Sequence, residues 1–139
     1  MTPSAHLAKA ARIERSLARL KPSDYEIRID GAMLAANHYV NLALHVLGLR
    51  RETEDIVHTE YLAAIDLTRF RVMAPAVLEA LEGIERLRAP FVRGGAPGGE
   101  EAGARALKFL IQAREAALKV EPPAFAIADY QAARSPATG

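Results

Sequence analysis

Residues 24–48 read DYEIRIDGAMLAANHYVNLALHVLG, and this stretch decides the fold that the sequence predicts. Asp24 follows Pro22 and Ser23, which interrupt the preceding helical pattern, so either Ser23 or Asp24 can cap a new helix. Gly48 is placed to end that helix in a left-handed conformation. The second half of the stretch is apolar on nearly all sides, which is typical of a helix at the centre of a fold or at an interface. We therefore predict a long central helix here.

Three further helical patterns flank this stretch, each with apolar residues at three- and four-residue steps. They lie at about residues 4–20, 73–92 and 100–119. Ser4 can cap the first of these helices, Pro75 suits the first turn of the second, and Glu100 suits the positive end of the third. The sequence therefore predicts an all-α fold, an antiparallel four-helix bundle, in which residues 49–73 form a crossover segment between helices two and three. The mixed periodicity of residues 56–70 allows one short helix within this segment.

The length and composition indicate one domain. The chain has 139 residues, of which 50% are hydrophobic, mostly Ala and Leu, and only 6% are aromatic. We expect residues 1–120 to form a single helical-bundle domain and residues 121–139, which contain Pro122 and Pro123, to form a partly disordered tail.

Several function classes are disfavoured by the same composition. The absence of Cys excludes disulfides, thiolate metal sites and a cysteine nucleophile. The net charge of +1 does not indicate a dedicated nucleic-acid-binding protein. No apolar run is long enough for a membrane span or a secretion signal, so we expect a cytoplasmic protein without a membrane partner. The excess of Arg over Lys, together with the high Ala content, suggests a bacterial source.

Polar residues interrupt the apolar central helix along one stripe. His38, Asn41 and His45 are spaced by three and four residues and therefore share a helical face. They are interpreted first as hydrogen-bonded polar residues at a bundle or dimer seam, second as a solvated face, and third as a site whose imidazole acts as a base or ligand. Asp30 and Glu26 lie at least two turns before His38, too far to share an ion, so no metal and no cofactor are expected.

Basic residues form a second group near the end of the predicted third helix. Arg86, Arg88 and Arg93 can contact phosphate groups, although solvation or pairing with neighbouring glutamates is the favoured interpretation. We take Asn41, Arg86 and Arg93 as candidate binding residues. The glycine-rich segment 94–99 is interpreted as a flexible connection, because it follows a helix rather than a strand and leads into two glutamates.

Helices two to four resemble the HEPN domain family of small helical-bundle proteins. The resemblance covers roughly residues 5–120. The stretch from Tyr25 to Leu44 is similar to the family's long Ala- and Tyr-rich helix, through Tyr25, Ala32, Ala35, Ala36, Tyr39, Ala43 and Leu44. The segment from Leu78 to Phe91 is similar to the family's Leu-x-x-Leu-x-x-x-Arg-x-x-Ala-Asp-Tyr segment, through Leu78, Leu81, Arg86, Arg88 and Ala89. The linker followed by Glu100-Glu101-Ala102 and by Ala104, Leu107, Leu110 and Ile111 resembles the family's last helix.

We expect a homodimer because the central helix is apolar on nearly all sides, more than one bundle core covers, and because members of this family usually dimerise. The resemblance also separates two functions. Many family members are metal-independent ribonuclease toxins that pair with a nucleotidyltransferase antitoxin and carry an Arg followed four to six residues later by His. Here Arg88 or Arg86 matches the family's arginine, but no His follows either of them before the chain ends, and Pro90-Phe91 replaces the family's Asp-Tyr. We therefore expect a non-catalytic dimer that binds a partner protein or a nucleotide-type ligand.

The alternatives come from other function classes. One is a ribonuclease toxin of such a pair, with Arg88 and either His38 or His45 as its catalytic residues and a nucleotidyltransferase as its partner. Another is a bundle that holds a small ligand in its core.

Overall fold

The computed structural model describes residues 1–123, and every regular element among them is helical. The α-helices are α1 (Pro3–Leu17), α2 (Tyr25–Val46), α3 (Ala64–Met73), α4 (Pro75–Arg88) and α5 (Gly99–Leu118). A 3-10 helix, η1 (Thr59–Tyr61), precedes α3, and a π-helical turn, η2 (Ala89–Arg93), follows α4 directly. The predicted all-α class is confirmed for this part of the chain. The disorder expected for the tail concerns residues 124–139, which lie outside the described residues.

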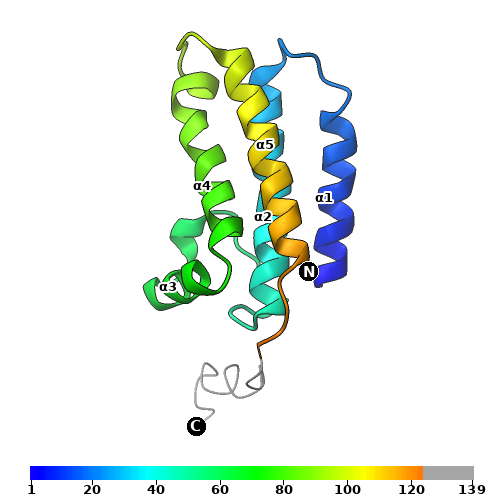
Figure 1. Ribbon diagram of the computed structural model, residues 1–139, viewed down its shortest axis with the longest axis vertical. Coiled ribbons are helices and arrows are strands. Elements are labelled where there is room, and N and C mark those ends of the chain that lie inside the picture. Colours follow the sequence, from blue (N-terminus) through cyan, green and yellow to red (C-terminus); the bar gives the residue numbers. More distant parts are fainter. Residues whose placement is uncertain (124–139) are drawn as a thin grey trace.

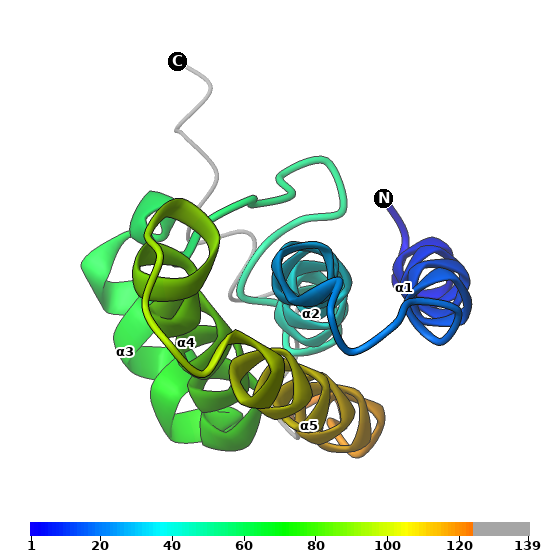
Figure 2. The ribbon, with the colours of Figure 1, turned by 90° about the horizontal axis from the view of Figure 1, so that it is seen from above.

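Helix α2 lies at the centre of the fold, as its apolar sequence predicts. Seen along the helices, α1, α5 and α4 stand on three sides of it, and the loop that leaves its C-terminal end arches over the fourth (Figure 2). Tyr39, Val40 and Leu44 are fully buried in this surround. The apolar second half of α2 is therefore covered within a single chain.

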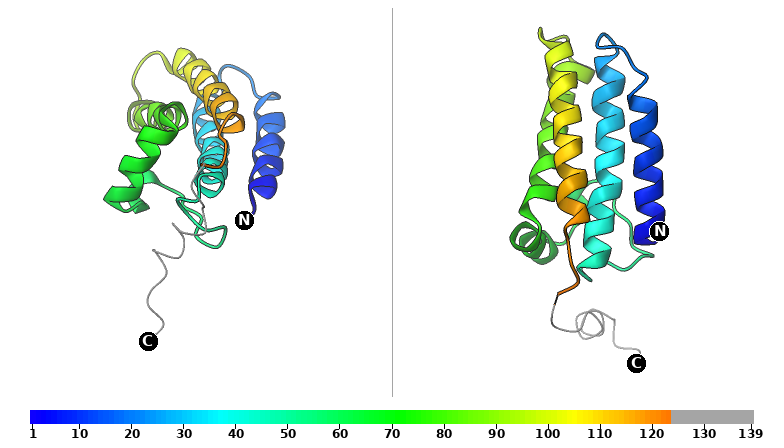
Figure 3. Two further views of the ribbon diagram at one scale, coloured as in Figure 1. Left: turned by 60° about the horizontal axis from the view of Figure 1, so that its bottom comes forward. Right: turned by 45° about the vertical axis from the view of Figure 1, so that its right-hand side comes forward.

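The long helices α1, α2, α4 and α5 stand side by side, and each runs opposite to the one before it in the chain (Figures 1 and 3). Helix α1 is antiparallel to α2, and α4 is antiparallel to α5, whereas α2 and α5 run in the same direction (Figure 1). None of the helices within residues 1–123 is both long enough and apolar enough to cross a membrane.

The segment 49–73 contains a short helix, α3, in addition to the predicted long helices, and the predicted third helix has other bounds than expected. Residues 1–123 contain five α-helices, because residues 64–73 form α3 and a separate helix begins at Pro75. Ala74 adopts a non-helical backbone with φ −144° and ψ 60°, because a residue directly before proline is sterically disfavoured in the helical region. The helix predicted over 73–92 therefore begins later and ends at Arg88 in the α-form.

The same helix ends in a π-turn because of a second proline. Pro90 has no N–H group to donate, so the regular hydrogen bonding of α4 cannot continue through it. The N–H of Gly94 instead donates to the carbonyl of Ala89, five residues back, at 2.9 Å. This wider turn carries Arg93 beyond the end of α4.

Helix starts also differ in detail from the predicted caps. Thr2, and not Ser4, caps α1: its Oγ1 accepts a hydrogen bond from the N–H of Ala5 at 3.1 Å. Pro3 suits the first helical position because the N–H that it lacks has no partner there. Asp24 does occupy the capping position of α2, but its carboxylate accepts from the N–H of Lys21 at 2.9 Å and so holds the preceding turn.

Gly48 reverses the chain after α2, as predicted. Its φ of +71° lies in the left-handed region that favours glycine. The carbonyl of Leu44 then accepts hydrogen bonds from the N–H groups of Leu49 and Arg50, at 2.9 and 3.3 Å. This reversal sends residues 49–58 back along α2, where they build the polar sites described next.

Candidate functional site

Asn41 holds the returning loop against α2. Its side-chain N–H groups donate to the carbonyls of Asn37 and Ile56, at 2.9 and 2.8 Å, and its Oδ1 accepts from the N–H of Ile56 at 2.8 Å. Asn41 is buried. Both of its N–H groups are committed to backbone carbonyls, so neither remains for the ligand that Asn41 was expected to bind. Asn41 instead fixes the position of the residues on either side of Ile56.

Asp55, the residue directly before Ile56, contacts histidines from two helices. Its Oδ1 lies 2.9 Å from Nε2 of His6 on α1 and 2.7 Å from Nε2 of His45 on α2. His6 Nδ1 in turn lies 2.9 Å from Nδ1 of His38. We call His6, His38, His45 and Asp55 the histidine cluster. Its other neighbour is the N-terminal amine of Met1, 2.9 Å from Asp55 Oδ2.

Burial and neighbouring charges shift the pKa values of this cluster in opposite directions. Burial lowers the pKa of His6, although the hydrogen bond to Asp55 opposes this effect. Burial, and then the neighbouring His6, lower the pKa of His38. For Asp55, burial alone would raise the pKa, but hydrogen bonds from the N-terminal amine, His45 and His6 outweigh it and lower the pKa to about 2. His6, whose pKa is lowered, thus contacts a carboxylate that favours the charged form, and His38, whose pKa is also lowered, contacts His6.

Directly after Ile56 and Val57, the loop forms one wall of a polar pocket of about 350 Å³. We call it the arginine pocket. Its lining residues come from the start of η1, from α4 and from η2, and they are His58, Thr59, Glu60, Glu85, Arg88 and Arg93. The side chain of Arg88 is held in place by Asp30, because its Nε donates to Asp30 Oδ1 at 2.8 Å. Burial raises the pKa of Glu85, with His58 as the strongest opposing influence.

The sequence-predicted residues divide between these two sites. Arg88 and Arg93 line the arginine pocket, whereas Arg86 points to solvent from α4 and does not line it. His38 and His45 belong to the histidine cluster.

The structure does not bring Arg88 together with His45. Arg88 pairs with Asp30, which lies fifteen residues before His45 on α2. At 1.5 Å per residue, this separation is roughly 22 Å along the helix.

Sequence reasoning missed Asp55, His58 and His6 as site residues. Asp55 ends a run of charged residues that is typical of a solvated loop, and nothing in that run indicates that it folds back onto α2. His6 lies 39 residues before His45, and His58 lies 30 residues before Arg88. The only available signal was the count of four histidines in the chain, which does not show which of them meet.

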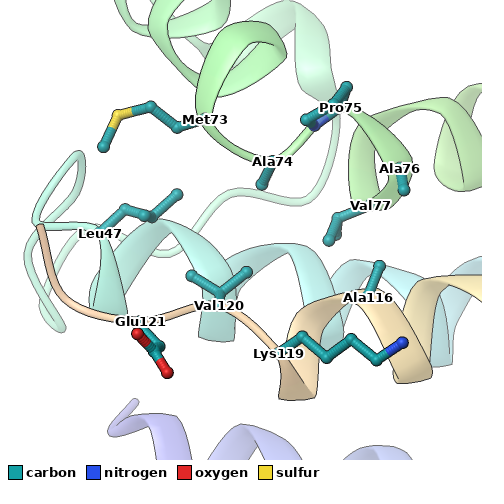
Figure 4. A pocket seen from close by; sticks show the side chains of 10 residues that line it. All are labelled: Leu47, Met73, Ala74, Pro75, Ala76, Val77, Ala116, Lys119, Val120 and Glu121. Atoms are coloured by element: carbon teal, nitrogen blue, oxygen red, sulfur yellow. The ribbon is translucent and has the colours of Figure 1, made fainter.

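A second cavity, separate from the arginine pocket, has mainly apolar walls. It has a volume of about 320 Å³ and lies between the C-terminal ends of α2 and α5 and the start of α4 (Figure 4). Its walls are mainly apolar, with Leu47, Met73, Val77 and Val120 among them, and Lys119 and Glu121 supply its charged groups. It contains none of the predicted site residues.

Comparison with known proteins adds no assignment to this geometry. No protein-family model, curated protein or solved structure matches the chain. The resemblance to the HEPN family stays a prediction.

Proposed function

We propose that this protein is a HEPN-like antiparallel helical bundle that binds a nucleotide-type ligand in the arginine pocket. The observation that carries the proposal is the convergence of Arg88, Arg93 and His58 on one polar cavity. Guanidinium groups are suited to phosphate because they donate planar, paired hydrogen bonds to its oxygens. Nε of Arg88 is held by Asp30, so its two terminal nitrogens remain for a ligand.

The acidic residues of the pocket narrow the ligand class. Glu60 and Glu85 line the same cavity as the arginines, so a bare phosphate would face carboxylates as well as guanidinium groups. A nucleotide carries a phosphate together with the N–H groups of its base, and those N–H groups can donate to a carboxylate. The mixed charge of the pocket therefore favours a nucleotide over inorganic phosphate.

Removing one guanidinium should weaken binding strongly. Arg93→Ala is expected to lower the affinity for ribonucleoside monophosphates about tenfold or more, because charge-assisted hydrogen bonds contribute roughly 1.5–3 kcal/mol each. Isothermal titration with the four monophosphates, and with inorganic phosphate for comparison, measures this effect. Arg86→Ala is the matched control, since it removes the same charge from the exposed side of α4. Equal losses in the two variants, or no binding of any monophosphate, would contradict the proposal.

The same pocket also supports a second function, a ribonuclease. The sequence after Arg88 lacks a histidine, but His58 reaches the same cavity from the loop before η1. His58 would take the proton of an RNA 2′-hydroxyl, whose oxygen attacks the adjacent phosphorus to form a cyclic phosphate. Glu85, whose pKa is raised by burial, would protonate the departing 5′-oxygen. Arg88 and Arg93 would stabilise the charge on the phosphorus oxygens.

The ribonuclease has its own test. Cleavage of single-stranded RNA is expected to persist in EDTA and to fall at least about 100-fold in His58→Gln, because positioned general bases contribute about 10²–10⁴-fold. The activity of Arg86→Ala should be unchanged, since this residue lies outside the pocket. If wild-type protein cleaves no RNA while it binds monophosphates, the pocket is a binding site only.

The homodimer is part of the same proposal, although the apolar second half of α2 does not require it. Its remaining support is on the first half of α2, where Ile27 and Leu34 are 59% and 53% exposed. They are seven residues apart and therefore share one side of α2. A second copy of the chain, or a nucleotidyltransferase partner, would cover this apolar strip.

A further inference from the structure

The histidine cluster is separate from the arginine pocket and has the composition of a metal centre. Among residues 1–123, one group of three metal-ligating side chains converges: His6, His45 and Asp55 place a ligand atom each within 4.8 Å of one another. Both imidazoles are only 1% exposed, whereas the carboxylate is 33% exposed. The three ligands come from α1, α2 and the loop, so the site exists only once these segments have packed together.

The distances leave room for an ion after a small adjustment. The two Nε2 atoms lie 2.9 and 2.7 Å from Asp55 Oδ1. In a tetrahedral zinc site with bonds of about 2.0–2.1 Å, neighbouring ligand atoms are about 3.3 Å apart. Each contact must therefore widen by about half an ångström, which the partly exposed Asp55 can allow. In this arrangement the ion would replace the hydrogen atoms that otherwise lie between these ligand atoms.

The hydrogen bonds of His45 are compatible with metal binding. His45 Nδ1 lies 3.0 Å from the carbonyl oxygen of Arg50, which can only accept, so Nδ1 must carry a proton. Nε2 faces Asp55 Oδ1 at 2.7 Å, where it donates a hydrogen bond in the metal-free protein and where a metal ion would take the place of that hydrogen atom. Metal-ligating histidines have this same tautomer, with the second ring nitrogen donating to a backbone carbonyl.

His6 has a corresponding outer partner. With a metal ion on Nε2, the Nδ1–H of His6 would donate to Nδ1 of His38, which lies 2.9 Å away. Asn41 positions Asp55 in turn, because it forms two hydrogen bonds with the backbone of the adjacent Ile56. Each proposed ligand is therefore held by a second group, as is usual for protein metal sites.

From this arrangement we infer that His6, His45 and Asp55 bind a divalent transition-metal ion, with Zn²⁺ the best fit. Two imidazoles and one carboxylate suit zinc, whereas calcium and magnesium prefer sites made of oxygen ligands. Three protein ligands leave one tetrahedral position for water or another exchangeable ligand, on the exposed side of Asp55. His38 and Asn41 are positioning residues of this site.

Zinc binding to the full chain with its own N-terminus tests the inference. After EDTA treatment and dialysis, isothermal titration with Zn²⁺ should show one ion per chain with a dissociation constant below micromolar. Asp55→Asn should weaken binding at least tenfold, whereas Glu52→Gln, which removes an exposed carboxylate from the same loop, should leave it unchanged. Circular dichroism of each variant confirms that it is folded.

Cobalt provides a readout that a merely structural role would not change. Co²⁺ bound by two imidazoles and a carboxylate should give the strong visible absorption of a four-coordinate site, and X-ray absorption should show only nitrogen and oxygen ligands. Loss of this signal in His45→Gln, with the fold retained, supports the inference. Absence of stoichiometric Zn²⁺ and Co²⁺ binding in the wild type, or equal weakening by Glu52→Gln and Asp55→Asn, overturns it and leaves a cluster held by protons alone.

Discussion

With free Zn²⁺ at a thousand times its dissociation constant, the free energy of unfolding is expected to rise by about 4.1 kcal/mol. The reason is that the three ligands come from α1, α2 and the returning loop, so the unfolded chain offers no assembled site. Chemical denaturation in zinc-buffered solution and in EDTA measures the difference. The increase should exceed the effect of any surface ion pair, since exposed pairs typically contribute only about 0–1 kcal/mol.

Two controls separate this stabilisation from a general effect of divalent cations. Mg²⁺ at the same concentration should leave the free energy of unfolding unchanged, because it binds imidazole poorly. Asp55→Asn should abolish the zinc-dependent increase, and Glu52→Gln should retain it. An equal increase with Mg²⁺, or in Asp55→Asn, would show that the ion acts elsewhere on the chain.

Tyr39→Ala is expected to lower the free energy of unfolding by about 3–5 kcal/mol, the usual effect of truncating a large buried aromatic side chain. Tyr39 is 1% exposed at the centre of α2. Its hydroxyl donates to Glu14 Oε2 at 2.6 Å, and Arg114 donates to the other oxygen of Glu14 at 2.7 Å. One side chain thus links α2 to α1 and, through Glu14, to α5.

Tyr39→Phe separates the hydroxyl from the ring. Burial, followed by the hydrogen bond to Glu14, raises the pKa of Tyr39 well above its usual value, so the hydroxyl stays protonated as a donor. Its removal should lower the free energy of unfolding by about 1 kcal/mol, because Glu14 is partly exposed and keeps its bond to Arg114. Tyr61→Ala, at an exposed tyrosine, should have little effect. Urea denaturation measures all three variants, and a Tyr39→Ala variant as stable as the wild type would contradict the central role of α2.

The helices that the sequence predicted well are those whose pattern is long and whose ends carry local signals. Residues 24–48 were predicted as one helix, and α2 spans Tyr25–Val46 with Gly48 in the left-handed conformation. Local signals also account for the errors: the effect of Pro75 on Ala74 and of Pro90 on the end of α4 follow from backbone geometry that was present in the sequence. A short helix was expected somewhere within residues 56–70, but the bounds of α3 could not be predicted because its ten residues lack a clear apolar stripe.

Only some residues of the two candidate sites could be found from the sequence. The shared stripe of His38, Asn41 and His45 is a property of α2 alone, so spacing was sufficient to find it. The partner of His45 was sought on the same helix, at Asp30 and Glu26, whereas the structure supplies Asp55 from the loop and His6 from α1. Arg88 and Arg93 were found as basic residues, but their pocket is completed by His58 from another part of the chain.

The sequence by itself therefore determined the all-helical class, the central helix and the polar stripe on it, because each depends on contacts within a few residues. Only the tertiary structure decided which charged and imidazole groups meet. His6 lies beside His45 because α1 packs on α2. Asp55 lies there because the chain reverses at Gly48 and because Asn41 is hydrogen-bonded to Ile56. Such contacts join residues that are far apart in the sequence, 49 positions for His6 and Asp55 and 100 for Glu14 and Arg114. No local pattern encodes a distance that depends on how whole helices pack.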